Sequence, residues 1–276
     1  MTSHFDWTGR VGDVWAEEWR RTDRAFADLA RHLDAAILAA APAGPIAALD
    51  LGCGGGATSA ALARARPEAR VLGADLSDAL IAIARDRFAD VPNLGFEQGD
   101  AIAIAEDHAP LDLVVSRHGV MFFSDPVLAF ERLRRTMTPG GALVFSCFAP
   151  AAENPWAVLL APAAPATAAY VPGPFSFGDP DRVGAMLRQA GWEAAAPARV
   201  AFAYRVGAGE DPVADATAFL TRIGPAARLL HDAPPADRPA LVERLADRLA
   251  AQRNASTIDF PAVAWLWTAR ARGELS

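Results

Sequence analysis

Apolar, strand-like runs alternate with helical segments along the middle of the chain, and this alternation limits the folds that the sequence can adopt. The strand-like runs are 46–51, 70–75, 94–98, 111–116 and 142–148, and the helical segments are 58–66, 80–88 and 126–137. Nearly continuous apolar strands separated by helices are typical of a parallel sheet with helices on both faces. The sequence therefore predicts an α/β fold with a doubly wound, mostly parallel sheet.

The segments on either side of this core indicate four parts. They are an N-terminal helical segment (1–45, with helical spacing over 15–41), the core (46–149), a proline-rich cap (150–178) and a C-terminal part that completes the core with inserted helices (179–276). In the last part we expect a helix at 179–190 that is capped by Asp179, a strand at 199–206, helices near 212–230 and 237–252, and a final strand near the end. The cap is too apolar for a disordered linker and too rich in proline for one long helix.

Composition excludes several classes of protein. A formal charge of −7 and a pI near 5.3 argue against nucleic acid or an anionic membrane as the main partner. All 26 basic residues are arginine, which excludes a lysine Schiff base and a P-loop lysine. Cys53 and Cys147 provide neither a disulfide framework nor a metal-ligand spacing, so we expect no metal. No apolar run approaches the length of a membrane span and no signal peptide is evident, so we expect a cytoplasmic protein.

A glycine-rich turn, LDLGCGGGATS at 49–59, follows the first strand of the predicted core. In open parallel sheets the ligand binds beyond the carboxyl ends of the strands, where this turn lies. A weak dinucleotide-binding pattern, G-x-G-x-x-A, begins at Gly52 and ends at Ala57. Asp50 argues against a diphosphate there, because its carboxylate repels phosphate and attracts an ammonium or a sulfonium group. The turn therefore favours a cationic ligand.

Two further carboxylates end the next two strands. Asp75 lies about 20 residues beyond the turn, where an acidic side chain accepts hydrogen bonds from ribose hydroxyls. Asp100, in the stretch QGDA, is placed to accept from an exocyclic amine such as that of adenine. Three carboxylates at three successive strand ends fit an adenosine that carries a cationic amino-acid tail.

With these residues the chain resembles the class I S-adenosylmethionine-dependent methyltransferases. The resemblance covers about 46–149 and rests on LDLGCGGG (49–56), GADLS (73–77), QGDA (98–101), LDLVVSRHGVMFF (111–123) and TPGG (138–141). A narrower resemblance, carried by ENPW (153–156), PGPFSFGDPDRV (172–183), IGPAARLL (223–230) and AWLWTAR (264–270), is to bacterial proteins described as similar to ubiquinone and menaquinone C-methyltransferases. That label fixes no substrate.

The resemblance implies a fold, a cofactor and a set of binding residues. The fold is a seven-stranded sheet whose last strand, 263–269 here, is antiparallel and inserted. The cofactor is S-adenosylmethionine. The implied cofactor-binding residues are Asp50, Gly52, Gly54, Gly56, Asp75, Leu76, Asp100, Ala101, Ser116 and Arg117.

Each acidic residue also has a purely structural interpretation. In that interpretation Asp50 caps the helix after the turn or pairs with an arginine. Asp75 lies directly before a helix start in which Ser77 is a suitable N-cap. Asp100 taken alone is ambiguous, and the joint placement of the three carboxylates favours the cofactor site.

His118, after the fourth strand, is the candidate general base, since imidazole titrates near neutral pH. Its structural alternative is a histidine that orders the loop by bonding backbone. Methyl transfer relies mainly on orientation and exclusion of water, so a base is required only when the acceptor must lose a proton.

Aromatic and apolar residues from three segments are candidates for the acceptor pocket. They are Trp15, Trp19, Met121, Phe122, Trp156, Tyr170, Phe175 and Phe177. A pocket with such walls suits a small apolar or aromatic acceptor, methylated at oxygen or carbon. Two alternatives stay open: a protein that binds S-adenosylmethionine without methylating, and a nicotinamide-dependent oxidoreductase. The acceptor and the oligomeric state are not predicted.

Overall fold

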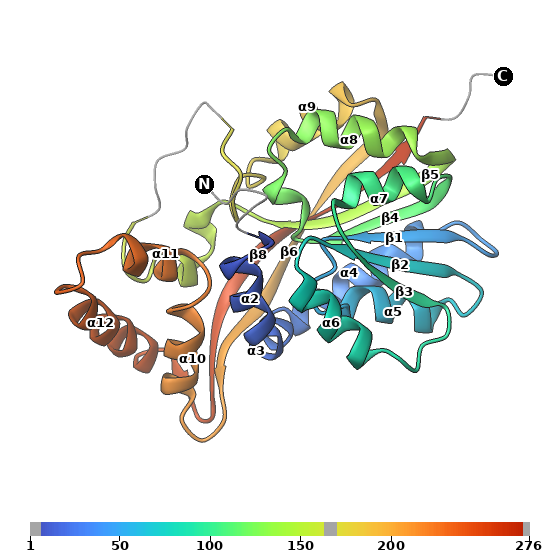
Figure 1. Cartoon of the computed structure of the whole chain (residues 1–276). Helices are drawn as coiled ribbons and strands as arrows, with labels where there is room; N and C mark the ends of the chain where they lie inside the picture. The colour runs from blue at the N-terminus through green and yellow to red at the C-terminus, as the bar shows by residue number, and fades with distance from the viewer. Residues whose placement is uncertain (1–6, 163–169, 273–276) are drawn as a thin grey trace.

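The computed structural model of the protein describes residues 7–162 and 170–272. Its centre is one twisted sheet with the strand order β3-β2-β1-β4-β5-β8-β6 (Figure 1). The strands are β1 (Ala47–Leu51), β2 (Arg70–Asp75), β3 (Leu94–Gln98), β4 (Leu111–Arg117), β5 (Met137–Phe148), β6 (Trp192–Ala208) and β8 (Thr257–Ala271), with a two-residue β7 (Arg253–Asn254) beside β8. Strands β1 to β5 are parallel, and β8 is antiparallel between β5 and β6. The predicted doubly wound sheet with an inserted last strand is confirmed.

Helices cover both faces of the sheet. Figure 1 shows α4 (Ala27–Ala40), α5 (Ala57–Ala65) and α6 (Asp78–Arg87) on one face, and α7 (Ala101–Asp107), α8 (Pro126–Arg135) and α9 (Pro180–Gln189) on the other. Strands β1 and β4 and residues 141–148 of β5 are almost fully buried, which explains their nearly continuous apolar sequences. Helix α7 was not predicted, because its seven residues are too few to show a helical period.

Side-chain caps define where several helices begin. Ser77 accepts a hydrogen bond from the backbone N–H of Leu80 at the start of α6, and Asp179 accepts from the first turn of α9. Both caps agree with the predictions. Such bonds satisfy N–H groups that have no partner within the helix.

Within the described residues 7–45, the N-terminal segment forms three helices rather than the one or two predicted over 15–41. They are α2 (Arg10–Glu17), α3 (Trp19–Ala25) and α4, and the breaks fall at Glu18 and Phe26. Helix α2 packs against the start of α6 so closely that a Cβ added at Gly12 meets the Ser77 side chain at 2.7 Å. Helix α2 therefore lies near the carboxyl end of β2, on the side of the sheet where the sequence predicts the cofactor.

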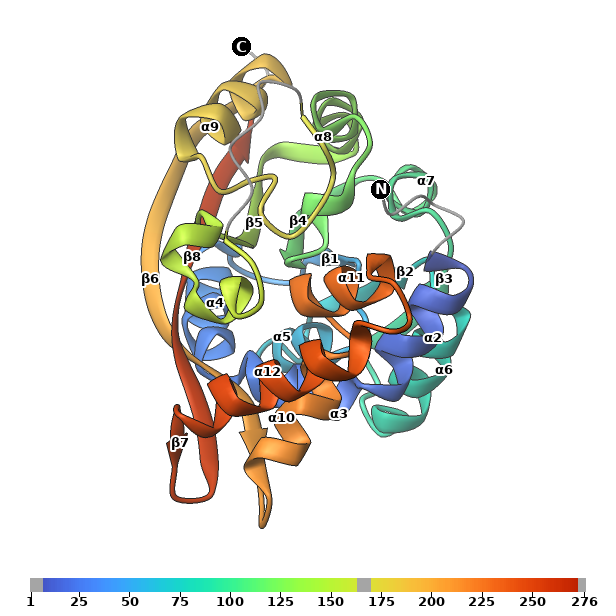
Figure 2. The ribbon, with the colours of Figure 1, turned by 90° about the vertical axis from the view of Figure 1, so that its left-hand side faces the viewer.

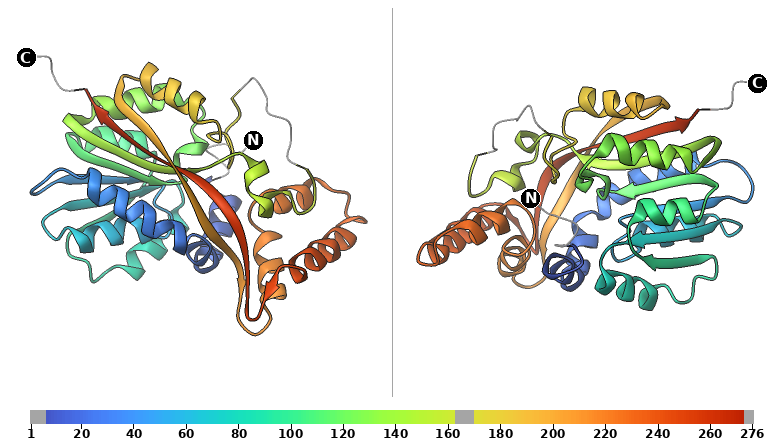
Figure 3. Two further views of the ribbon diagram at one scale, coloured as in Figure 1. Left: turned by 180° about the vertical axis from the view of Figure 1, so that it is seen from behind. Right: turned by 45° about the horizontal axis from the view of Figure 1, so that its top comes forward.

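Strands β6 and β8 run past the sheet as a curved two-stranded ribbon (Figure 3). Between them the chain forms α10 (Pro212–Leu220), α11 (Pro225–Asp232) and α12 (Arg238–Ala250), which face the viewer in Figure 2. The helix predicted over 212–230 is thus two helices, separated by a turn at Gly224, whose φ of 90° suits glycine. We call α10 to α12 the helical insertion.

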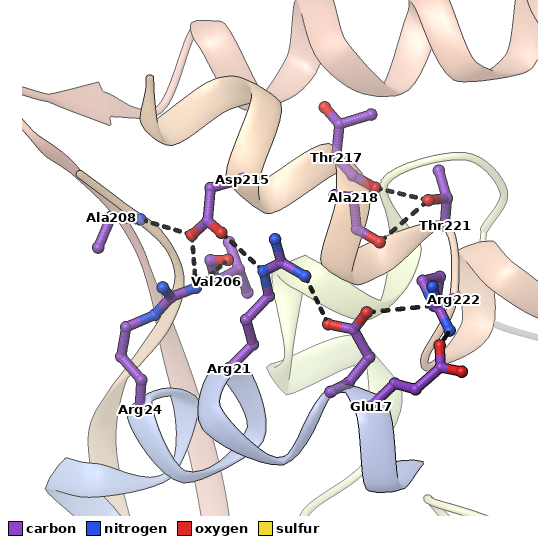
Figure 4. A network of polar contacts seen from close by, with 11 residues as sticks. Glu17, Arg21, Arg24, Val206, Ala208, Asp215, Thr217, Ala218, Thr221 and Arg222 are labelled. Carbon is purple, nitrogen blue, oxygen red and sulfur yellow. Dashed lines mark hydrogen bonds and ion pairs between the residues drawn. The ribbon is translucent and has the colours of Figure 1, made fainter. Parts of the chain in front are cut away.

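Ion pairs join the N-terminal helices to the helical insertion (Figure 4). The Asp215 carboxylate of α10 accepts from Arg21 Nε at 2.6 Å and from Arg24 at 2.7 Å. Buried Glu18 bonds Arg21 at 2.8 Å and pairs with Arg222 at 3.1 Å. These contacts connect segments that are almost 200 residues apart, and they fix the insertion against α3.

The proline-rich segment folds back on the core. It contains the short helices η2 (Ala151–Glu153) and η3 (Pro155–Val158), and residues 163–169 lie outside the described part. Buried Asn154 donates to Ala149 O and accepts from Val263 N, which fastens the segment to β8. The Met121 carbonyl accepts from Gly173 N at 3.1 Å. The four-part division of the chain stays a prediction. No helix among the described residues is long and apolar enough to cross a membrane.

Candidate cofactor and acceptor site

The glycine turn after β1 has the backbone that its sequence requires. Gly52, Gly54 and Gly56 have φ angles of 64°, 54° and 81°, a region that favours glycine. A Cβ at Gly56 would lie 2.7 Å from Phe96, so the turn is also closely packed there. At Gly54 the added Cβ meets nothing within 4 Å, so the turn is open at this point.

Asp50, at the end of β1, is completely buried below the turn. Its Oδ2 accepts a hydrogen bond from Ser59 Oγ at 2.6 Å, and its Oδ1 has no partner among the described residues. Burial raises the pKa of Asp50 to about 7, against the opposing effects of the Ser59 bond and the charge of Arg117, while Asp75 adds to the rise. Asp50 does not cap α5, since the cap position is Gly56.

Asp75, at the end of β2, is bonded to the glycine turn itself. Its Oδ2 accepts from Gly54 N at 2.9 Å, and its Oδ1 accepts from Ser77 N at 2.9 Å. Burial raises the pKa of Asp75, although these two backbone bonds favour the ionised form. The backbone N–H of Leu76 also favours the ionised form, and the three backbone bonds leave one lone pair of the carboxylate free for the ribose contact that the sequence predicts.

Asp100 and Ala101 lie where β3 passes into α7. Asp100 is exposed and is the N-cap of α7, with its Oδ1 accepting from Ile102 N at 2.8 Å and from Ala103 N at 3.3 Å. Leu76, half-buried, follows β2 on the neighbouring strand end, and its carbonyl accepts from Gln98. The structure thus brings the predicted adenine-side residues to one edge of the sheet, and their contact with adenine stays a prediction.

Ser116 and Arg117 end β4 beside the turn. The buried Ser116 hydroxyl donates to Leu51 O at 2.7 Å and accepts from Gly119 N at 3.1 Å, so it joins the ends of β1 and β4. These internal bonds engage the hydroxyl's donor and one of its acceptor sites, which leaves Ser116 little capacity for the cofactor contact implied by the resemblance. Arg117 points instead to α3, where it donates to Asp23 at 2.9 Å.

Helix α3 covers the glycine turn, an arrangement that the sequence analysis did not predict. We call α3, with Asp23 and its partners Arg87 and Arg117, the roof. Asp23 accepts from Arg87 at 2.7 Å as well as from Arg117. Arg87 in turn donates to the Gly55 carbonyl at 2.6 Å and lies 3.8 Å from the centre of the Trp19 ring. The partners of Asp23 are 64 and 94 residues away, so no local pattern reveals them.

His118 lies just beyond β4 with a positive φ of 65°, and its imidazole is buried. Its ring centre is 4.8 Å from that of Phe26 and 4.3 Å from that of Phe148. Nδ1 lies 2.8 Å from Ser146 Oγ, and Nε2 has no partner among the described residues. Burial, aided by the charge of Arg117, lowers the pKa of His118 to about 3. The imidazole is therefore neutral near pH 7 and is a weak base, which does not favour the predicted general-base role.

His118 belongs to an aromatic cluster, in which its ring contacts Phe26 and Phe148. Two predicted acceptor residues, Trp156 and Phe175, belong to it, and their ring centres are 5.9 Å apart. Sequence reasoning missed its other members, which are Phe26, Phe148, Phe202 and Tyr204. Phe148 is the last residue of β5, so its place at a strand end was the available signal. We call these six rings, together with His118, the aromatic cluster.

The other predicted acceptor residues lie elsewhere. Phe177 is a correction: its side chain is completely buried in the core, against Phe130 of α8 and Phe145 of β5. Tyr170 uses its hydroxyl to fasten the cap, by donating to the Phe123 carbonyl at 2.8 Å.

The remaining candidates are close to the roof or to the cap. Trp19 packs on Arg87 beside the glycine turn. Trp15 and Phe122 both contact the ring of Trp7, at 5.9 and 5.1 Å, and Met121 is buried under the cap. Their contact with an acceptor stays a prediction.

The residues of the turn fit a cationic nucleoside. The unpartnered Oδ1 of Asp50 provides a buried acceptor that a cation would hold ionised, the space above Gly54 is open, and Asp75 and Asp100 follow the two neighbouring strands. No group of three His, Cys, Asp or Glu side chains in residues 7–162 and 170–272 is placed to hold a metal ion.

Comparison with known proteins agrees with this geometry. A family model described as a methyltransferase domain matches residues 48–141. The chain is 33% identical over 171 residues to the trans-aconitate 2-methyltransferase of Methylobacterium radiotolerans, a match that covers 60% of this chain and 62% of that one. The chain therefore spans less than two thirds of this relative's length. The resemblance to quinone C-methyltransferases stays a prediction.

Solved structures show the same fold at low sequence identity. The phosphoethanolamine N-methyltransferase 2 of Haemonchus contortus, solved with S-adenosylmethionine, has a TM-score of 0.54 at 16% identity and covers 99% of this chain and 61% of its own. The cyclase SpnF has a TM-score of 0.54 at 21% identity, covering 88% and 81%. The methyltransferase-domain match over residues 48–141, the related sequences and the strand order of the sheet together support a class I S-adenosylmethionine-dependent methyltransferase.

Proposed function

We propose that the protein transfers a methyl group from S-adenosylmethionine to a small apolar or aromatic acceptor, at an oxygen or a carbon atom. The observation that carries the proposal is the unpartnered Oδ1 of Asp50, because a buried carboxylate oxygen at the glycine turn favours a cation over a diphosphate. The aromatic cluster beyond β4 and β5 supports an apolar acceptor.

S-adenosylmethionine supplies, when bound, a methyl group on a positively charged sulfur. In this proposal Asp50 lies near the cationic methionyl part, Asp75 accepts from the ribose, and Asp100 with Ala101 holds the adenine edge. The backbone of Gly52, Gly54 and Gly56 allows the close approach that the turn requires.

The chain's own contribution to catalysis is orientation and exclusion of water. Helix α3 covers the turn through Asp23 and Arg87, and the aromatic cluster provides an apolar wall next to the end of β4. We assign no general base, because His118 is neutral near pH 7 and holds protons weakly.

Substrates of the relatives enter here only as candidates. The name of the Methylobacterium enzyme makes trans-aconitate a compound to test. The aromatic walls around His118 favour apolar compounds over a polycarboxylate, since a buried carboxylate requires a paired charge.

The test combines binding and product analysis. Calorimetry with S-adenosylmethionine, S-adenosylhomocysteine and NAD identifies the cofactor, and we expect the first two to bind. Incubation with S-adenosylmethionine and a panel of phenols, quinols, enolisable carbonyl compounds, amines and trans-aconitate is followed by mass spectrometry for a methylated product. Binding of NAD alone contradicts the proposal. Cofactor binding without any methylated product supports a non-methylating protein, the role suggested by the structural likeness to a cyclase.

A further inference from the structure

Two buried N–H-bearing groups of the aromatic cluster lack hydrogen-bond partners in the described part of the chain. They are Nε2 of His118 and Nε1 of Trp156, whose side chains both contact Phe148. Tyr204, packed 4.6 Å from Trp156, also has no described hydrogen bond, and burial alone raises the pKa of its hydroxyl. Buried polar groups are rarely left unpaired, because each loses its hydrogen bonds to water. Their concentration at one place indicates a ligand-binding position.

The hydrogen-bond partners of Ser146 determine which nitrogen of His118 carries the proton. Ser146 is completely buried on β5, and the sole described partner of its hydroxyl is Nδ1 of His118, at 2.8 Å. A buried hydroxyl hydrogen requires an acceptor, so Ser146 donates and Nδ1 accepts. A neutral imidazole has one N–H, which is then at Nε2. His118 therefore presents a donor to the cluster.

The two unpartnered nitrogens are therefore both hydrogen-bond donors. Indole Nε1 of Trp156 is a donor in every state, and Nε2 of His118 is a donor in the tautomer assigned above. The surrounding rings of Phe26, Phe148 and Phe175 provide no strong acceptor. The nearest charge, Arg117, lies 5.6 Å from the centre of the Phe26 ring and is already paired with Asp23.

We propose that the aromatic cluster binds an acceptor molecule whose polar group is a carbonyl or phenolate oxygen, held by the N–H groups of His118 and Trp156. This inference rests on the proposed function and names the substrate class of the same site. An amine brings further N–H donors to a place where His118 and Trp156 already present donors and only the Tyr204 hydroxyl can accept, so amines are disfavoured. The site thereby selects O- or C-methylation over N-methylation, with His118 as a substrate-binding donor rather than a base.

Two probes of one shape test the polarity of the cluster. We compare 4-nitrophenol with 4-nitroaniline on the full chain saturated with S-adenosylhomocysteine, because the two molecules differ only in the hydroxyl and amino groups. The absorbance of 4-nitrophenolate also reports its ionisation. We expect the phenol to bind at least about tenfold more tightly than the aniline, with its pKa lowered in the complex. Equal binding of the two probes, or binding of neither at the limit of solubility, overturns the proposal.

Matched variants identify the donors. His118→Phe and Trp156→Phe each remove an N–H and keep a ring, and we expect each to weaken 4-nitrophenol binding by about tenfold. His118→Gln keeps a donor and is expected to restore part of the affinity. Trp265→Phe is the control, since its indole already donates to the Gly178 carbonyl. Unchanged binding in both donor variants contradicts the assignment.

A measurement on the unaltered protein covers the case in which a variant does not fold. Nitrogen-15 NMR of the imidazole distinguishes the two tautomers, and we expect the His118 proton on Nε2. A proton on Nδ1 overturns the inference. None of these readouts requires methyl transfer, so a protein that fails to methylate but shows the expected probe selectivity refutes the proposed function and leaves this inference standing.

Discussion

Asp50 has an unusual position for an ionisable side chain, because it is buried and only one of its oxygens is bonded. Its pKa of about 7 means that the carboxyl is partly protonated in the free protein at neutral pH. The three groups that influence this ionisation are Ser59 and Arg117, which favour the carboxylate, and Asp75, which opposes it. A bound cation favours the ionised carboxylate, as Ser59 and Arg117 do. Cofactor binding and the protonation of Asp50 are therefore coupled.

Binding of S-adenosylmethionine should release a proton from Asp50. At about pH 6 the free carboxyl is mostly protonated and the cation favours its ionised form, so affinity rises with pH through about 7 and then levels off. Calorimetry in buffers of different ionisation enthalpy measures the protons released. Asp50→Asn is expected to lose this component and to bind more weakly. If Asp50→Asn releases as many protons as the original protein, another group is responsible.

The same burial affects stability. The folded pKa of Asp50 is above its ordinary value of 3.8, so the folded state holds the proton more tightly than the unfolded chain. The stability contributed by this group is fully present below about pH 4 and is lost as pH rises through about 7. We expect the melting temperature of Asp50→Asn to fall less than that of the original protein between about pH 5 and 8. If the melting temperatures of the two proteins fall equally over this pH range, burial of Asp50 does not have the expected effect on stability.

At the scale of elements, α3 is a short helix with two charged sides. Asp23 faces the glycine turn and holds Arg87 and Arg117, whereas Arg21 and Arg24 face the helical insertion and hold Asp215. Residues three or four apart share a face of a helix, so these spacings place the two sets on different sides. The helix therefore connects the roof of the cofactor site with the inserted helices.

Asp23→Asn should weaken cofactor binding without unfolding the protein. The substitution leaves Arg87 and Arg117 without a charged partner, which loosens α3 over the turn, and we expect a loss of affinity of about tenfold for S-adenosylhomocysteine. Calorimetry measures the affinity and circular dichroism checks the fold. Asp13→Asn, an exposed position on α2, is the matched control. Equal affinities for the two variants would show that the contacts of Asp23 do not contribute to cofactor binding.

At the scale of the whole molecule, the helical insertion is attached to the remainder by the β6–β8 ribbon and by the ion pairs of Figure 4. Asp215 is central to these contacts, since its carboxylate also accepts from Ala208 N at 3.0 Å. Its side chain is 19% exposed, so the pairs are partly screened by water.

Asp215→Asn is expected to destabilise the fold by about 1 to 3 kcal/mol, because it leaves Arg21 and Arg24 partly buried and without their shared partner. Urea unfolding measures the change. Asp232→Asn removes an acidic residue from a solvent-exposed pair 3.8 Å long, and its effect should stay within about 0.5 kcal/mol. Similar effects for both variants would show that the network does not stabilise the molecule.

The predictable part of the structure is local. The apolar runs at 70–75 and 94–98 became β2 and β3 with the predicted bounds, and Asp179 capped α9 as expected. The places of Asp50 and Asp75 at strand ends beside the glycine turn were also predictable, and their contact with the cofactor stays a prediction. Sequence reasoning was wrong about Phe177, whose burial in the core decides its role, and it did not predict the bond of the Ser116 hydroxyl to the Leu51 carbonyl.

The sequence alone determined the order of strands and helices, the glycine turn and the carboxylates beside it, because hydrophobic period, turn backbone and helix caps depend on neighbouring residues. The tertiary structure decided the roof made by Asp23, the aromatic cluster and the contact between Ser146 and His118. These features depend on partners tens of residues away, such as Ser146 for His118, and pairing between distant side chains leaves no periodic signal in a single chain.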